Sequence, residues 1–286
     1  MNATILASST DRPAWFAARQ GGVTATDIAR LVRGGAGTWA AIRAEKAGTA
    51  RDFHNAAMQH GNDREPVVLA YAQSAFGLLP CGDLYAADDE PRFLATPDAI
   101  NADEIGEVKT TVHDWEVLSD VPGRYIDQML WQMRVTGRRR GHLIFEPHEN
   151  GVPTYPWPKH FLVEYDAERV AVLERTAYEF LAGEQEPDEE AAALDALLTE
   201  FVELDEIAAA AARRRDEAKA RIEEQLHGEP KRFEGSVANL TRSADSTSRR
   251  FDSAAFKKAA PDTFEQFQIA VPVKGRLTIT TRSDTA

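Results

Sequence analysis

The chain has 286 residues, of which 43% are hydrophobic and 28% charged, so it is long enough for one catalytic domain with a sizeable core and a smaller appendage. No apolar run approaches the length that spans a bilayer, and the N-terminus lacks the basic start and apolar stretch of a secretory signal, so we expect a cytoplasmic protein without membrane contact. The single cysteine excludes an internal disulfide framework, and the net charge of −13 excludes indiscriminate coating of nucleic acid while leaving room for a local basic groove.

The first part of the chain, residues 15–183, mixes helical and strand-like patterns, which is typical of an α/β or α+β domain. A helix is predicted over residues 27–32, with Thr24 or Thr26 as its cap. A run of glycines should stop this helix, and another helix should begin near Thr38.

A third helix is predicted over residues 65–74, with Pro66 in its first turn and Gly77 at its end. Two strand-like segments follow, residues 92–100 and 104–111, separated by a turn-prone sequence. These two segments should pair with each other.

A helical pattern over residues 125–135 precedes a short strand over residues 142–145. The resulting order of strand, strand, helix and strand returns the chain to the same sheet. We assign residues 1–185 to this domain.

The remainder is predicted to form a long helical arm over residues 186–228 and a small C-terminal α+β module over residues 229–286. In the module, residues 236–241 and 276–281 resemble strands and residues 253–259 a helix. The arm carries an apolar stripe at helical spacing, which suits a helical hairpin or a coiled coil: Leu194, Leu197, Leu198, Phe201, Leu204, Ile207, Ala211, Ala218, Ile222 and Leu226.

The residues that indicate chemistry are Asp98 and, nine positions later, the triplet Glu107-Val108-Lys109. Side chains alternate between the faces of a strand, so Glu107 and Lys109 should point one way and Val108 into the opposite, buried face. The turn between the two segments can bring Asp98 close to Glu107. Two carboxylates there make an oxygen site for Mg²⁺, beside a lysine that can orient water or stabilise charge on phosphorus.

Taken alone, a Glu-x-Lys triplet is most often an exposed strand with alternating charges. Glu229-Pro230-Lys231 matches the same pattern by accident. The aspartate at the right spacing is what favours a site.

The sequence from about Trp15 to Phe145 resembles the phage lambda exonuclease and YqaJ-like viral recombinase group of PD-(D/E)XK nucleases. The resemblance rests on several motifs in the family's order and spacing: Trp15-x-x-x-Arg19, Thr24-Ala25-Thr26-Asp27-Ile28, Gly61-x-x-x-Glu65-Pro66, Thr96-Pro97-Asp98, Glu107-Val108-Lys109, Tyr125-x-x-Gln128 and Val135-Thr136-Gly137. It implies a restriction-endonuclease-like core, a mixed central sheet flanked by helices.

The resemblance also implies roles for individual residues. Asp98, Glu107 and Lys109 would form the catalytic metal and water site, with Mg²⁺ as the cofactor and Mn²⁺ as a substitute. Glu65 would add to the metal site, although an acid in the first turn of a helix is also favoured by the helix dipole. Gln128 would lie beside the catalytic centre, unless it is an ordinary exposed helical glutamine.

A pocket for a terminal 5′-phosphate is implied for Arg19, Thr24 and Thr26, because a guanidinium and hydroxyls beside a helix N-terminus are good phosphate donors. For Arg19 the alternative is a surface salt bridge. Arg138 and Arg139 either contact the DNA backbone or form a solvated turn.

The function implied is a phage or prophage exonuclease that binds the end of double-stranded DNA and degrades one strand 5′ to 3′ for recombination, in the host cytoplasm. Its implied partners are a single-strand annealing protein and further copies of the chain. Two alternatives stay open: another PD-(D/E)XK activity, such as an endonuclease or a helicase-linked nuclease, and a non-catalytic DNA-binding scaffold.

Overall fold

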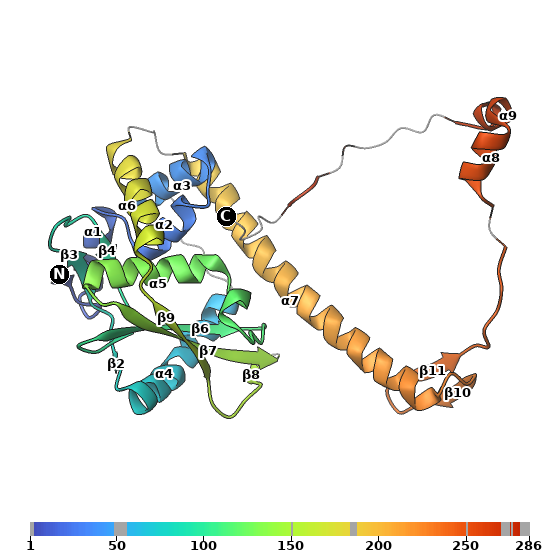
Figure 1. Ribbon diagram of the computed structural model, residues 1–286, viewed down its shortest axis with the longest axis horizontal. Helices are drawn as coiled ribbons and strands as arrows, with labels where there is room; N and C mark the ends of the chain where they lie inside the picture. Colours follow the sequence, from blue (N-terminus) through green and yellow to red (C-terminus); the bar gives the residue numbers. More distant parts are fainter. Residues whose placement is uncertain are drawn as a thin grey trace. The chain divides into compact units, whose positions relative to one another are not determined.

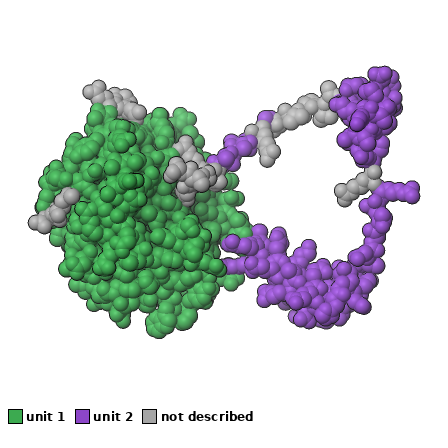
Figure 2. All heavy atoms as spheres, in the orientation of Figure 1, with its two compact units in different colours: residues 1–210, 283–286 green, residues 211–282 purple. Residues whose placement is uncertain are grey.

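The computed structural model describes residues 3–48, 56–149, 151–183, 188–249, 251–269, 275 and 277–280. The chain divides into two compact units, one within residues 1–210 and one within residues 211–282 (Figure 2). The helices and strands of the larger unit are β1 (Ala3–Ala7), α1 (Arg12–Gln20), α2 (Ala25–Leu31), α3 (Ala36–Lys46), α4 (Ala56–Phe76), β2 (Leu79–Pro80), β3 (Leu84–Ala87), β4 (Leu94–Ala95), β5 (Ala99–Ile100), β6 (Glu104–Thr111), η1 (Leu118–Asp120), α5 (Gly123–Thr136), β7 (Arg140–Glu149), β8 (Val152–Pro153), β9 (Lys159–Glu164), α6 (Ala167–Ala182) and the first part of α7 (Glu189–Leu226).

The main sheet of this unit has the strand order β2-β5-β6-β7-β8, with β9 also paired to β7. The two longest strands, β6 and β7, run parallel from Glu104↔Arg140 to Thr111↔Pro147, and their neighbours run antiparallel. A parallel pair needs a crossover, which α5 supplies. The expected mixed sheet flanked by helices is therefore confirmed (Figure 1). A separate sheet has the order β1-β3-β4.

Each face of the main sheet is covered by a different helix, as Figure 1 shows. On one face, Leu143 and Phe145 of β7 belong to the same apolar core as Trp131 of α5. On the other, Val108 and Ile144 pack in a core with Val68 of α4. The alternation of β6 therefore buries Val108 against α4 and directs its neighbours toward α5, as the sequence pattern predicted.

The helix boundaries confirm some expectations and correct others. Thr24 caps α2, and its side chain and that of Asp27 form a reciprocal capping box. The helix expected at residues 65–74 begins at Ala56, so Pro66 lies inside α4 instead of in its first turn. That prediction was wrong because interior prolines usually break a helix, whereas here the packing of α4 on the sheet outweighs the lost hydrogen bond. Gly77, at φ +67, follows the helix end as expected.

The arm and the C-terminal segment are helical and strand-like in the expected regions, with differences in detail. α7 extends into the second unit and Gly228 follows it at φ +79. The second unit also contains β10 (Lys231–Glu234) paired with β11 (Asn239–Arg242), and the helices α8 (Ser253–Ala259) and α9 (Pro261–Gln266). Residues 277–280 are not a strand, and the ends of the expected strand at 276–281 lie outside the described residues.

The apolar stripe of the arm is exposed. Its large side chains retain between 42% and 58% of their accessible surface: Leu194, Leu197, Leu198, Phe201, Leu204, Ile207 and Ile222. The division into nuclease domain, arm and module stays a prediction. Among the described helices, none combines the length and the apolar character needed to cross a bilayer.

Candidate active site

The carboxylate of Glu107 is the centre of the site. The pleat of β6 places Glu107 and Lys109 on the face covered by α5, and Glu107 retains only 1% of its accessible surface. The Lys109 ammonium donates to Glu107 Oε1. A buried carboxylate is costly unless it is fully hydrogen-bonded, so its other partners decide whether the arrangement is stable.

Those partners come from two glutamines on α5. Gln128 Nε2 donates to Glu107 Oε1 over 2.5 Å, and Gln132 Nε2 donates to Glu107 Oε2 over 2.6 Å. Gln128 is therefore no ordinary exposed glutamine. Gln132, which the sequence analysis missed, is fully buried. Its position four residues after Gln128, on the same helix face, is the signal that could have revealed it.

Asp98 follows the short strand β4 and lies against the backbone of β6. Its Oδ2 accepts the Val108 N–H over 2.7 Å, which fixes the carboxylate beside Glu107. Burial raises the pKa of Asp98 well above its usual range, and the negative charge of Glu107 raises it further, while Lys109 opposes both. Without a cation, this acid is thus held toward its neutral form.

Glu65 approaches the same cluster from the middle of α4. Burial first, and then the Glu107 carboxylate, raise the pKa of Glu65, whereas Lys109 lowers it. Because Glu65 lies well inside the helix, the dipole of a first turn does not account for it. The electrostatic effect of Glu107 instead links it to the site.

The donor chemistry of this cluster fits a divalent metal. Three carboxylates, those of Glu65, Asp98 and Glu107, influence one another's charge, and a hard cation would relieve the repulsion. In the described part of the chain, no group of three or more His, Cys, Asp or Glu side chains is arranged to hold a metal ion. Mg²⁺ does not require one, since it keeps several waters and binds through one or two carboxylates.

Lys109 remains a cation in this setting. Burial lowers its pKa, but the Glu107 and Asp98 carboxylates outweigh burial and raise the pKa above the usual value. Its Nζ also lies 5.2 Å from the centre of the Tyr125 ring. The site therefore combines carboxylate oxygens with a lysine ammonium that is charged at neutral pH.

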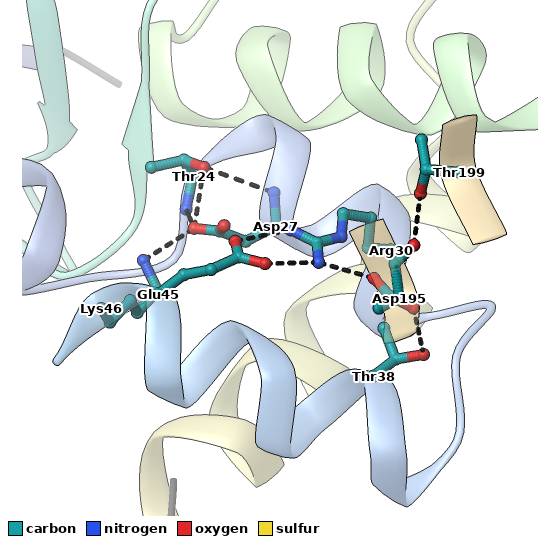
Figure 3. Close-up of polar contacts among 8 residues, drawn as sticks. All are labelled: Thr24, Asp27, Arg30, Thr38, Glu45, Lys46, Asp195 and Thr199. Carbon is teal, nitrogen blue, oxygen red and sulfur yellow. Dashed lines mark hydrogen bonds and ion pairs between the residues drawn. The ribbon is translucent and has the colours of Figure 1, made fainter. Parts of the chain in front are cut away.

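Arg19, Thr24 and Thr26, the residues expected to bind a terminal 5′-phosphate, do not all present their polar groups to solvent. Thr24 is buried, and its hydroxyl donates to Asp27 Oδ2 over 2.8 Å (Figure 3). Thr26 is exposed on the first turn of α2. Arg19 stacks on Trp15, with its guanidinium carbon 4.4 Å from the ring, and burial lowers its pKa while Asp27 opposes this effect. The hydroxyl of Thr24 thus serves the capping box, and that of Thr26 faces solvent.

Lys46 of α3 is a further cation at this place that the sequence analysis did not single out. Its Nζ lies 2.7 Å from Asp27 Oδ2 (Figure 3). It also donates to the Arg19 carbonyl over 3.2 Å. Gly22 allows this segment to approach the residues just before β4 closely, because a Cβ there would lie 2.2 Å from the Arg92 carbonyl oxygen. The capping segment is therefore held firmly against the sheet.

Arg138 and Arg139 do not join the catalytic cluster. They precede β7 at the end where Arg140 pairs with Glu104, whereas Lys109 lies opposite Phe145. The Arg138 guanidinium donates to the Thr136 and Asn101 carbonyls over 2.7 and 3.1 Å. Arg139 is exposed and lies over the Tyr165 ring at 4.0 Å. Contact with the DNA backbone stays a prediction for both.

Residues 14–139 match the YqaJ-like viral recombinase domain. They contain the whole carboxylate cluster, Lys109 and both glutamines. The expected family is therefore confirmed.

Solved structures extend the likeness beyond the YqaJ-like domain. One is the crystal structure of LHK-Exo in complex with dAMP, with 26% identity and a TM-score of 0.51, covering 67% of this chain and 99% of that chain. Another is an alkaline exonuclease, LHK-Exo from Laribacter hongkongensis, with 26% identity and a TM-score of 0.50, covering 66% and 97% of the two chains. No curated protein matches the chain. The fold of an exonuclease is thus present over about two thirds of the protein.

Proposed function

We propose that the protein is a DNA exonuclease that uses Mg²⁺, with Mn²⁺ as a substitute, to degrade one strand of duplex DNA from an end, 5′ to 3′. The enzyme class follows from the YqaJ-like domain and from the likeness to an alkaline exonuclease. The observation that supports the metal-dependent chemistry is the buried Glu107 carboxylate, held by Lys109, Gln128 and Gln132 beside Asp98.

The chain's own groups have distinct tasks in this proposal. Asp98 and Glu107, with Glu65 nearby, would hold the cation. When bound, the metal would polarise the scissile phosphate and lower the pKa of a water molecule. Lys109, charged and close to both carboxylates, orients the attacking water or stabilises negative charge on phosphorus. Gln128 and Gln132 keep the Glu107 carboxylate from rotating.

Recognition of a DNA end is assigned to the segment around α2. Arg19 and Thr26 offer a guanidinium and an accessible hydroxyl at a helix N-terminus, which suits a terminal 5′-phosphate. Thr24 would act mainly by holding this segment in shape. The 5′ to 3′ direction of degradation depends on this pocket, since an enzyme that binds a terminal 5′-phosphate begins digestion at the 5′ end.

The biological setting is also a proposal. The protein would act in the cytoplasm of a host cell, in phage or prophage recombination, with a single-strand annealing protein and further copies of itself as partners. The exposed apolar stripe on α7 is available for such assembly.

The decisive experiment is digestion of end-labelled duplexes carrying a 5′-phosphate or a 5′-hydroxyl, in Mg²⁺ or in EDTA. We expect EDTA and Lys109→Ala each to abolish nucleotide release, while Lys219→Ala, which changes an exposed lysine of α7, leaves it intact. Cutting of covalently closed circles would instead indicate an endonuclease. Binding without any cutting in Mg²⁺ or Mn²⁺ would indicate a non-catalytic scaffold.

A further inference from the structure

Two further side chains, Arg124 and His113, lie close to the proposed catalytic lysine. Arg124, at the start of α5, lies over the Tyr125 ring with its guanidinium carbon 4.7 Å from the ring centre. The same ring lies 5.2 Å from the Lys109 ammonium. Arg124 is therefore one aromatic ring away from the proposed catalytic lysine, and its side chain is 39% exposed.

His113 joins Arg124 from the segment that follows β6. The chain turns there because the His113 N–H donates to the Thr111 hydroxyl over 3.0 Å. The imidazole is 31% exposed. His113 thus reaches the surface just after β6 and Arg124 at the start of α5, and these two elements carry the proposed catalytic residues Glu107, Lys109 and Gln128.

A carboxylate from a distant part of the sequence already lies between them. Glu206 of α7 approaches His113 Nε2 at 3.6 Å and Arg124 at 3.8 Å. The contact with His113 lowers the pKa of Glu206, burial opposes this effect, and the charge of Arg124 lowers the pKa further. The pair consequently stabilises an anion at this position.

We propose that Arg124 and His113 form a binding site for a backbone phosphate of the DNA substrate, and that the Glu206 carboxylate takes this phosphate's place in the DNA-free protein. The inference rests on the proposed function, because it requires DNA at the active site. A guanidinium next to an imidazole offers charge and hydrogen-bond donors to a phosphate. In a chain with a net charge of −13, such local cations must supply the phosphate contacts.

Two other cations of the same unit, Arg64 and Lys159, are held by closer acids. Arg64 forms two bonds of 2.7 Å to the buried Glu146, and Lys159 forms one of 2.5 Å to Asp114. The contacts of Glu206 with His113 and Arg124 are longer, and the three side chains are between 31% and 39% exposed, so this ion pair can open at little cost. Phosphate can therefore displace Glu206 more readily than it can displace Glu146.

The test is the affinity of the full chain for a short fluorescein-labelled duplex with a 5′-phosphate, measured by anisotropy in EDTA at several salt concentrations. Glu206→Gln should bind about two- to fivefold more tightly at low salt. Arg124→Gln should bind about fivefold more weakly, and its slope of log affinity against log salt should be smaller by about one. Asp205→Asn removes an equal charge from the exposed neighbouring position and should bind like wild type.

The double variant Arg124→Gln/Glu206→Gln separates competition from a general charge effect. Once Arg124 is gone, loss of Glu206 should add little affinity. Equal affinities of Glu206→Gln and Asp205→Asn would overturn the proposal, and so would an unchanged salt slope in Arg124→Gln. A lower melting temperature of Glu206→Gln without a gain in affinity would also overturn it. If wild type releases nucleotides in Mg²⁺ but the variants bind DNA as wild type does, the phosphate site is wrong and the proposed function stands. If wild type neither binds nor digests DNA ends, the proposed function itself is wrong.

Discussion

Gln128 and Gln132 lie one turn apart on α5, and each donates to a different oxygen of the Glu107 carboxylate. The two amides therefore clamp the carboxylate in one orientation, with Lys109 as the third donor. A carboxylate that is fixed in this way keeps its free lone pairs in one orientation for binding a cation. Outer hydrogen-bond partners of metal ligands commonly set metal affinity in this manner.

Gln132→Leu should lower activity even though Gln132 is not expected to touch DNA. The substitution leaves Glu107 Oε2 without its buried donor, so kcat/KM should fall about 10- to 100-fold and half-saturation should require more Mg²⁺. Steady-state digestion across a Mg²⁺ titration measures both effects. Gln73→Leu, at an exposed position of α4, serves as the matched control. An unchanged Mg²⁺ requirement in Gln132→Leu would mean that Gln132 only fills space.

Arg19→Gln should reduce the preference for 5′-phosphorylated ends. The guanidinium is held over Trp15 at 4.4 Å, in position to meet a terminal phosphate beside α2. Loss of this contact should lower kcat/KM on phosphorylated ends about tenfold and leave 5′-hydroxyl ends unaffected. Arg12→Gln removes the other arginine over the same ring, at 5.1 Å, and should keep the preference. An equal effect of both variants would assign Arg19 to packing on Trp15.

The chemistry-bearing part of the fold could be predicted because it depends on local patterns. The alternation of β6 placed Glu107, Val108 and Lys109 on their correct faces, and the capping residue of α2 was among the two expected. The start of α4 could not be predicted, since packing on the sheet overrides the local preference of Pro66. The contact of Glu206 with Arg124 was equally out of reach. It joins residues far apart in sequence through tertiary structure alone.

The buried Asp27 should give the protein an acid-sensitive component of stability. Burial raises its pKa, but Lys46 and the Thr24 donors outweigh burial and depress it below the usual value (Figure 3). A depressed carboxyl pKa stabilises the fold above the unfolded value of about 3.9, and this contribution disappears as the pH falls through the folded value. Asp27→Asn should thus destabilise the protein by about 1–3 kcal/mol at neutral pH.

Urea unfolding from neutral pH down to about pH 3 measures this difference. The difference in stability between wild type and Asp27→Asn should shrink as the pH falls below about 3.9, because the unfolded chain then takes up a proton that folded Asp27 resists. Asp103→Asn, an exposed position, should follow wild type throughout. A constant difference between Asp27→Asn and wild type at every pH would show that shape, not charge, matters at this position.

Asp98→Asn should abolish activity and yet stabilise the metal-free protein. Burial and the Glu107 charge raise the pKa of Asp98, so ionisation of this group destabilises the fold as the pH rises from about 3.9 through the raised value. Asparagine is neutral and can still accept the Val108 N–H, which removes the repulsion without breaking that bond. In EDTA at neutral pH, its melting temperature should exceed that of wild type by about 2–4 °C.

Added Mg²⁺ should reverse the order of the two proteins. A ligand that binds only the folded state raises the melting temperature, and wild type keeps the carboxylate that the cation requires whereas Asp98→Asn does not. Calorimetry with increasing Mg²⁺ should thus raise the wild-type transition above that of the variant. If Asp98→Asn melts below wild type in EDTA, the Asp98 carboxylate stabilises the native state. The carboxylate would then not lower the stability of the metal-free protein in order to bind the metal.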